Sequence, residues 1–225
     1  MRKGADLKPE VSIITPLYNA EKYIKDTVDS VLSQTYQNYE WLIVDDCSTD
    51  ASREIVKNLA CEDKRVKLLD MKFNRGPVFA RNYALDHARG RFIAFLDSDD
   101  VWMPEKLEKQ LTLMKEKKAP LSYTGYKKIT IDGIIKTGIT VPVPEKLSYN
   151  LLLGSNSIMA SSAIYDTSIT GSIRQVHDIP LGKDDYFFFL SIIKKHGLAY
   201  GLKEDLARLR IHNDSITGNK IEAAK

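Results

Sequence analysis

Residues 91–104, with the sequence RFIAFLDSDDVWMP, contain a short apolar run that ends abruptly in acidic side chains. The run 92–96 is typical of a buried strand, and Asp97, Asp99 and Asp100 follow at its carboxyl end. In open α/β sheets ligands bind at that end of the strands. On an extended chain Asp97 and Asp99 would point the same way, roughly 7 Å apart. Because such carboxylates need a positive partner, the stretch favours Mg²⁺ or Mn²⁺ held together with substrate phosphates.

A second interpretation of the same stretch is structural. Pro104 and Glu105 resemble the first turn of a helix, and an acidic turn in front of a helix is common. The stretch alone leaves both interpretations open.

The chain before and around this stretch alternates strand and helix through residue 118. Such alternation predicts an α/β fold with a mostly parallel sheet covered by helices on both faces. Asn19 is placed to cap the first helix. The expected strands are 11–15, 41–44, 66–69 and 92–96, and the expected helices are 20–34, 51–60, 77–88 and one beyond Pro104 that carries Leu107, Leu111 and Met114.

From Leu121 onward the pattern becomes shorter and more mixed. Asp132-Gly133 is typical of a hairpin turn. The remaining expected elements are a short helix at 147–153, a strand at 158–164, an apolar helix at 186–195 that follows Asp184 and Asp185, and a strand at 206–211.

Composition is ordinary for a globular protein of 225 residues, with 43% hydrophobic and 28% charged residues. A net charge of +3 is too small to indicate a nucleic-acid partner. No run approaches 18 apolar residues and the N-terminus lacks an apolar signal core, so we expect a cytoplasmic protein with at most peripheral contact at the inner face of the membrane. Cys47 and Cys61 are expected to be thiols without a disulfide or metal.

Four separated segments together carry a resemblance. They are VSIITPLYNAEKYI with SVLSQTY, WLIVDDCSTD, NRGPVFARNYALDHARGRFIAFLDSDD, and the acidic pair in GKDDYFFFL. In this order and spacing, over about residues 10–218, the chain resembles the family 2 glycosyltransferases with a GT-A fold, of the bacterial teichuronic-acid, capsule and O-antigen type. The resemblance implies one domain over 1–225, with a donor half at 10–118, an acceptor and base half at 119–218, and a tail at 219–225.

The resemblance implies inverting transfer of a sugar from a nucleotide diphosphate donor, with uridine as the expected base, to a hydroxyl of a glycan or lipid-linked acceptor, assisted by Mn²⁺ or Mg²⁺. By position it implies a general base at Asp185, with Asp184 as the rival, and metal ligands at Asp99 and His212. The implied donor-binding residues are Pro16, Tyr18, Asn19, Asp45, Asp46, Asn74, Arg81, Asp97 and Ser98.

This chemistry needs neutralisation of the departing diphosphate, to which Arg75 or Arg81 can add a charge-assisted bond, and a base for the acceptor hydroxyl. Each residue also has an ordinary interpretation. Asp185 can be a first-turn carboxylate, Asp45 and Asp46 can close an Asx-turn, and the arginines and His212 can be surface residues.

The sequence departs from the family pattern in two places. Cys47 stands where glycine is common, and the chain ends soon after the segment Arg210-Ile211-His212. The alternative function is a nucleotide-sugar-binding scaffold that keeps the fold without turnover.

Overall fold

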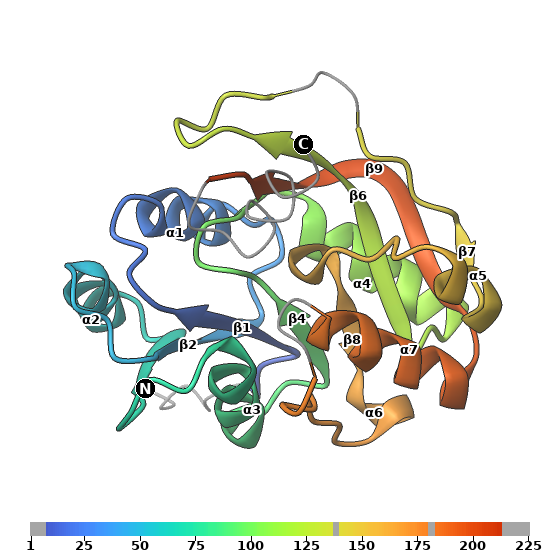
Figure 1. Ribbon diagram of the computed structural model, residues 1–225, viewed down its shortest axis with the longest axis horizontal. Helices are drawn as coiled ribbons and strands as arrows, with labels where there is room; N and C mark the ends of the chain where they lie inside the picture. The colour runs from blue at the N-terminus through green and yellow to red at the C-terminus, as the bar shows by residue number, and fades with distance from the viewer. Residues whose placement is uncertain (1–7, 137–139, 180–182, 213–225) are drawn as a thin grey trace, which may run out of the picture.

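The computed structural model describes residues 8–136, 140–179 and 183–212. Within these ranges one sheet of nine strands has the order β3-β2-β1-β4-β8-β6-β9-β5, with β7 paired to β9 (Figure 1). The strands are β1 Val11–Leu17, β2 Tyr39–Asp45, β3 Val66–Asp70, β4 Phe92–Phe95, β5 Val101–Trp102, β6 Leu121–Ile129, β7 Lys146–Leu147, β8 Ile164–Asp166 and β9 Ala199–Arg210. The helices are α1 Ile24–Leu32, α2 Ser52–Glu62, α3 Pro77–His87, α4 Lys106–Lys117, α5 Tyr149–Gly154, α6 Thr167–Thr170 and α7 Asp184–His196, with a 3₁₀ turn at Ala160–Ser162.

The first half of the sheet is parallel, as the alternating pattern predicted. Strands β3, β2, β1 and β4 are neighbours in that order and run the same way, with Leu17 opposite Asp45 in the register of β1 and β2. Parallel strands place their carboxyl ends at one edge. The segments that follow β1, β2 and β4 therefore meet at that edge of the sheet.

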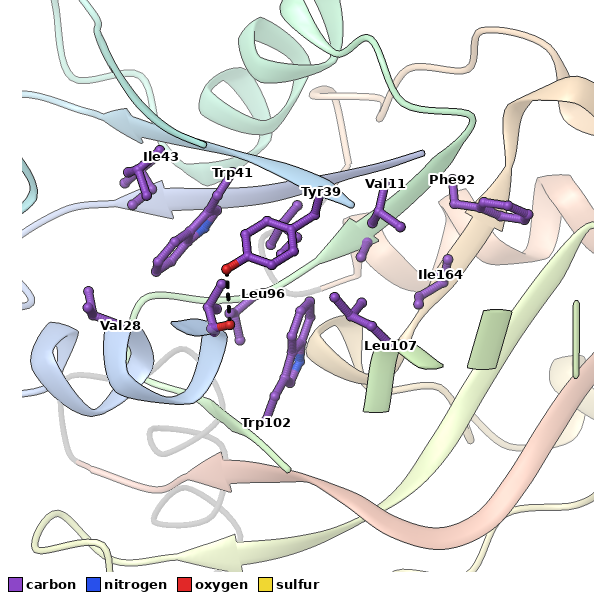
Figure 2. Close-up of a cluster of buried hydrophobic side chains, with 14 of the residues drawn as sticks. Val11, Val28, Tyr39, Trp41, Ile43, Phe92, Leu96, Trp102, Leu107 and Ile164 are labelled. Carbon is purple, nitrogen blue, oxygen red and sulfur yellow. Dashed lines mark hydrogen bonds between the residues drawn. The ribbon is translucent and has the colours of Figure 1, made fainter. Parts of the chain in front are cut away.

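Alternation along β1 divides the core into two layers. Val11 and Ile13 face a layer packed with residues of α1, α2 and α4, whereas Ile14 faces a layer packed with residues of α3, α5 and α7. Figure 2 shows the first layer, in which Trp41 and Trp102 are almost completely buried. A fully buried isoleucine side chain contributes about 1.5–3 kcal/mol to stability. Apolar side chains on both faces therefore stabilise the parallel half of the sheet.

Strand β8 joins the two halves of the chain, because it pairs antiparallel with both β4 and β6. Beyond β6 the chain turns at Asp132-Gly133, as expected: Gly133 has φ of 77° and Thr130 donates its backbone N–H to Ile134 over 2.7 Å. The chain returns later as β9, which runs parallel to β6. Residues 213–225, including the expected tail at 219–225, lie outside the described residues.

Three expected elements differ from the structure. The first helix begins at Ile24 rather than at residue 20, and its N-cap is Tyr23 rather than Asn19. The expected strand 158–164 instead contains the 3₁₀ turn at Ala160–Ser162, and strand β8 begins only at Ile164. The local hydrogen bond from Ser162 Oγ to the Met159 carbonyl, 2.7 Å, favours this turn over a strand.

The last strand is longer than expected, because β9 begins at Ala199 rather than at residue 206. The polar residues 203–205 interrupt the apolar pattern, so the sequence does not indicate the first part of β9. Here β6 and β9 approach closely around a register shift at Gly125, where an added Cβ would lie 2.8 Å from the Lys203 carbonyl oxygen.

No helix in the part of the chain that the structure describes has the length and apolar character to cross a membrane. Cys47 and Cys61 are both free thiols.

Candidate active site

A buried guanidinium lies at the centre of the polar edge of the sheet. Arg81, on α3, is 4% exposed and donates from Nη2 to Asp97 Oδ1 over 2.6 Å. Its Nη1 donates to Asp184 Oδ2 over 3.2 Å and to Asp185 Oδ1 over 3.3 Å. Burial by itself would lower the pKa of Arg81, but the three carboxylates outweigh it and raise that pKa. One cation therefore connects the acidic loop after β4 with the N-terminus of α7.

The two acidic residues that begin α7 differ in exposure. The Asp184 side chain is 6% exposed, whereas that of Asp185 is 27% exposed. Burial raises the pKa of Asp185 to about 6, with Asp184 and Asp97 adding to the effect and Arg81 opposing it. A carboxylate that is partly open and titrates near pH 6 can accept a proton at neutral pH. Of the two rivals, Asp185 is the more exposed, and its role as a general base remains a prediction.

The acidic loop is a turn rather than the extended chain assumed from the sequence. Asp100 donates its backbone N–H to the Asp97 carbonyl over 3.2 Å, and the Ser98 carbonyl lies 2.9 Å from Thr27 Oγ1. Asp97 consequently contacts Arg81, whereas Asp99 contacts a residue beyond β9. The expectation that Asp97 and Asp99 point the same way along a strand is wrong, because the strand ends at Phe95.

Asp100, the third carboxylate of the loop, is structural. It is 1% exposed and accepts hydrogen bonds from Ser161 Oγ over 2.5 Å and from the Arg210 backbone N–H over 2.9 Å. Burial, reinforced by Asp99 and Asp97, raises the pKa of Asp100 well above its usual range. This carboxyl group anchors the loop to the end of β9.

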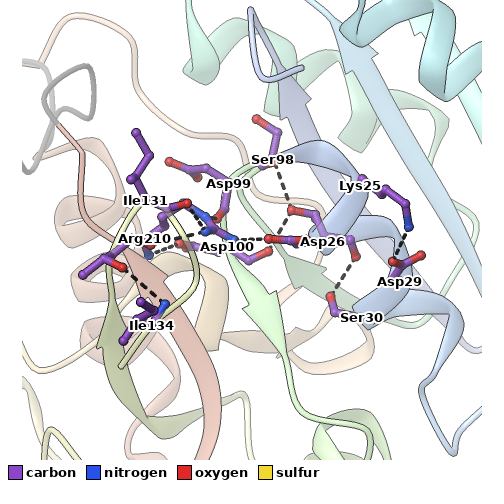
Figure 3. Close-up of polar contacts among 12 residues, drawn as sticks. Lys25, Asp26, Asp29, Ser30, Ser98, Asp99, Asp100, Ile131, Ile134 and Arg210 are labelled. Atoms are coloured by element: carbon purple, nitrogen blue, oxygen red, sulfur yellow. Dashed lines mark hydrogen bonds and ion pairs between the residues drawn. The ribbon is translucent and has the colours of Figure 1, made fainter. Parts of the chain in front are cut away.

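Arg210 completes that anchor (Figure 3). Its side chain is 1% exposed and donates from Nε to the Asp99 carbonyl over 2.8 Å. It also donates from Nη1 to the Ile131 carbonyl over 2.8 Å and from Nη2 to Asp26 Oδ2 over 2.7 Å. Arg210 thus fixes the backbone of Asp99 against α1 and the turn after β6.

His212 lies beside Asp99, the other predicted metal ligand. Its Nε2 is 2.8 Å from Asp99 Oδ2, and its ring stacks on Tyr23 with centroids 4.7 Å apart. Among the described residues no group of three or more His, Cys, Asp or Glu could hold a metal ion. One carboxylate and one imidazole nevertheless fit a Mn²⁺ or Mg²⁺ ion whose remaining ligands are diphosphate oxygens and water.

The polar segments that follow β1 and β2 are joined by hydrogen bonds. Asn19 adopts φ of 47° and its Oδ1 accepts from the Thr49 backbone N–H over 2.8 Å. Asp45 accepts from the Ser48 backbone N–H at 3.2 Å, which is the turn-closing contact of the structural interpretation. The Asn19 side chain thus bonds to the segment after β2 and does not cap α1.

Asp46 is 2% exposed and ties two segments together. Its two oxygens accept from the backbone N–H groups of Arg75, at 2.9 Å, and Gly76, at 2.7 Å. These bonds fix the start of α3, and therefore the position of Arg81. Any additional contact of Asp46 with a donor base remains a prediction.

The other predicted donor residues lie at the open edge. Tyr18 is 52% exposed, Asn74 is exposed and Pro16 is half-buried. Arg75 lies with its guanidinium carbon 3.8 Å from the Phe79 ring centroid, so its charge is directed onto that ring rather than onto the Arg81 cluster. These exposed side chains are available to a ligand.

Two loop residues make local contacts. Asn156 Oδ1 accepts from the Ile158 backbone N–H over 3.3 Å, which is the loop-capping contact. His177 packs against Phe79 with ring centroids 4.7 Å apart.

Sequence reasoning missed two residues of this site, Ser161 and Gln175. The Ser161 hydroxyl donates to Asp100 and accepts from the Asp97 backbone N–H over 3.0 Å, so it binds two residues of the acidic loop. Gln175 donates from Nε2 to Asp185 Oδ1 over 2.8 Å. Neither lies in a recognisable motif, so only the fold reveals them.

Comparison with known proteins defines the class that this fold and site indicate. The model of the family described as "Glycosyl transferase family 2" matches residues 12–163, so the chain belongs to that family and is a glycosyltransferase. The Bacillus subtilis (strain 168) protein TuaG, assigned to teichuronic acid biosynthesis, is 44% identical over 97% of this chain and 85% of its own length. The Escherichia coli UDP-Glc:alpha-D-GlcNAc-diphosphoundecaprenol beta-1,3-glucosyltransferase WfgD is 38% identical over 96% of this chain and 82% of its own length.

Solved structures confirm the GT-A fold. S. aureus TarS 1–349 in complex with UDP-GlcNAc is 25% identical with a TM-score of 0.74, covering 92% of this chain and 60% of that chain. The mannosyltransferase PcManGT from Pyrobaculum calidifontis, in complex with GDP-Man and Mn²⁺, is 19% identical with a TM-score of 0.72, covering 97% of this chain and 62% of that chain. This chain thus spans about three fifths of the length of either solved chain, and the second likeness concerns the fold alone.

Proposed function

We propose that this glycosyltransferase moves a sugar from a UDP-sugar to a hydroxyl of a lipid-linked glycan acceptor, with inversion at the anomeric carbon. One observation carries the proposal. The Arg81 guanidinium contacts both Asp97 of the acidic loop and Asp185 at the start of α7, so the loop and the base are held around one charge.

The displacement requires two things of the protein. Asp185 removes the proton of the acceptor hydroxyl as that oxygen attacks the anomeric carbon, and the bond to the diphosphate breaks on the opposite face. Arg81 neutralises part of the negative charge around Asp185 and lowers its pKa, so the Asp185 carboxylate is ionised at neutral pH although burial raises that pKa to about 6.

Asp99 and His212 are the residues that would hold a divalent ion. A bound Mn²⁺ or Mg²⁺ would neutralise the charge that develops on the departing diphosphate. Arg210 keeps the Asp99 backbone in place for this role, and Tyr23 supports the ring of His212.

The choice of donor and acceptor rests on the relatives. The name of WfgD specifies UDP-Glc as donor and a GlcNAc-diphosphoundecaprenol acceptor, and TarS was solved with UDP-GlcNAc. We therefore place the reaction in cell-surface polysaccharide synthesis, with peripheral contact at the cytoplasmic face of the membrane where such an acceptor lies.

The first experiment is a donor screen by thermal shift in the presence of Mn²⁺, using UDP-glucose, UDP-GlcNAc and GDP-mannose. A true donor raises the melting temperature by linkage. UDP release is then measured with a synthetic GlcNAc-diphosphate carrying an alkyl chain as acceptor.

Asp185→Asn and Asp184→Asn are compared in that assay. We expect Asp185→Asn to lower kcat by about 10²–10⁴-fold, the usual contribution of a general base. Donor binding without UDP release in the wild-type protein would instead favour the scaffold interpretation.

A further inference from the structure

A buried amide contacts the proposed base from a segment that carries no recognisable motif. Gln175 lies between α6 and α7, is 2% exposed, and donates from Nε2 to Asp185 Oδ1 over 2.8 Å. The same oxygen lies 3.3 Å from Arg81 Nη1. Two donors from different elements therefore converge on one oxygen of Asp185.

The segment that carries Gln175 is fastened to α3. Asn82 donates from Nδ2 to the Gln175 carbonyl over 2.8 Å, and its Oδ1 accepts the Gln175 backbone N–H over 2.9 Å. The neighbouring Arg174 pairs with Asp86, also on α3, over 2.5 Å. Helix α3 thus supplies Arg81 directly and holds Gln175 through the adjacent residue Asn82.

The amide of Gln175 is poorly explained as a packing group. Its Oε1 is buried and has no hydrogen-bond partner among the described residues. A buried acceptor without a partner reduces stability, so an aliphatic side chain of similar size would serve packing better. What glutamine adds is the N–H directed at Asp185.

We propose that Gln175 is a positioning residue for Asp185, which ties Oδ1 in place so that Oδ2 faces the acceptor hydroxyl. Across residues 8–136, 140–179 and 183–212, the hydrogen bonds of the Asp185 side chain fall on Oδ1. The inference rests on the proposed role of Asp185 as the base. A small displacement of such a group has a large effect on rate, because the reacting atoms must meet in one geometry.

The electrostatic consequence has a definite sign. Arg81 from α3, Asp97 from the loop after β4 and Asp184 from α7 are the charged groups that act on Asp185, and the Gln175 N–H lowers its pKa. Loss of that N–H raises the pKa of Asp185. The acid limb of the pH–rate profile then moves to higher pH.

The test compares Gln175→Leu with a matched control, Gln110→Leu. Gln110, on α4, is also fully buried, donates to Ser122 Oγ over 3.1 Å and has a buried Oε1 without a partner in the described part of the chain. Turnover is measured with UDP-glucose, Mn²⁺ and the synthetic GlcNAc-diphosphate acceptor between pH 5 and 9, together with thermal unfolding.

Gln175→Leu is expected to lower kcat about 10–100-fold, to leave the donor KM within about twofold and to move the acid limb upward. Its melting temperature should change no more than that of Gln110→Leu, which keeps the wild-type limb. Asn82→Ala, which releases the segment, should shift the limb in the same direction.

Asp185→Asn, measured alongside, distinguishes a failure of the positioning role of Gln175 from a failure of the base assignment of Asp185. If Asp185→Asn abolishes turnover while Gln175→Leu keeps the wild-type kcat and limb, the positioning role is wrong and the base assignment stands. If Asp185→Asn keeps the wild-type kcat, the base assignment fails and the positioning role fails with it. A loss in Gln175→Leu that only follows its melting temperature would also overturn the inference.

Discussion

Replacing Arg81 by methionine removes a buried cation that contacts three carboxylates. The Arg81 side chain is 5% exposed and lies 2.6 Å from Asp97, 3.2 Å from Asp184 and 3.3 Å from Asp185. Removing one partner of a buried ion pair costs about 3–5 kcal/mol, because the remaining charge is left without compensation. For a protein of this size that corresponds to a fall in melting temperature of roughly 6–20 °C.

The pH dependence of this loss identifies its cause. Arg81 lowers the pKa of Asp185, so the pKa of Asp185 in the variant lies above the value of about 6 in the wild-type protein. A carboxyl group whose folded pKa exceeds its unfolded pKa favours the folded state at low pH and loses that contribution as pH rises. The destabilisation by Arg81→Met should therefore be largest above the raised pKa of Asp185 in the variant and shrink as pH falls from there to about 6.

Denaturant unfolding at pH 7.5 and pH 5.0 measures both effects. Arg53→Met is the control, because Arg53 pairs with Asp70 at the surface, where both side chains are at least 43% exposed. Such a pair contributes about 0–1 kcal/mol. Wild-type stability of Arg81→Met at pH 7.5, or a loss that grows at pH 5.0, would show that Arg81 does not compensate these carboxylates.

Further predictions concern the base and the proposed metal ligands. The pH profile of kcat/KM should rise with pH through about 6 and then level off, because Asp185 must be ionised to act; a flat profile between pH 5 and 7 would exclude it. His212→Ala should raise the half-saturating Mn²⁺ concentration for UDP release about 10–100-fold. Arg210→Lys should raise it too, because it loosens the backbone of Asp99. An unchanged Mn²⁺ titration would contradict these roles. EDTA should abolish UDP release and added Mn²⁺ or Mg²⁺ restore it, whereas release that survives EDTA would argue against a metal-assisted reaction.

The parallel half of the fold could be predicted because its signals are local. Each strand from β1 to β4 is an apolar run, and each is followed by a segment with helical spacing. The later strands could not be predicted as well. Strand β9 mixes buried, half-buried and exposed positions without regular alternation, and it approaches β6 closely at Gly125.

The same distinction applies to the site. Asp99 and Asp185 stand in recognisable acidic motifs, so the sequence pointed to them. Arg81 and Asp184 are 103 positions apart in the sequence, and Arg210 and Asp99 are 111 positions apart. A periodic sequence pattern does not predict contacts between residues so far apart. Asn19, expected to cap α1, instead binds the backbone of Thr49, because its positive φ starts a turn before the helix begins.

The stereochemistry of transfer is the sharpest test of direct displacement assisted by Asp185. The anomeric configuration of the new glycosidic bond is read by NMR after reaction of α-linked UDP-glucose with the synthetic GlcNAc-diphosphate acceptor. Attack assisted by Asp185 from the face opposite the diphosphate predicts a β-linked product, which Asp185→Asn should form about 10²–10⁴-fold more slowly. An α-linked product would contradict direct displacement and the role given to Asp185.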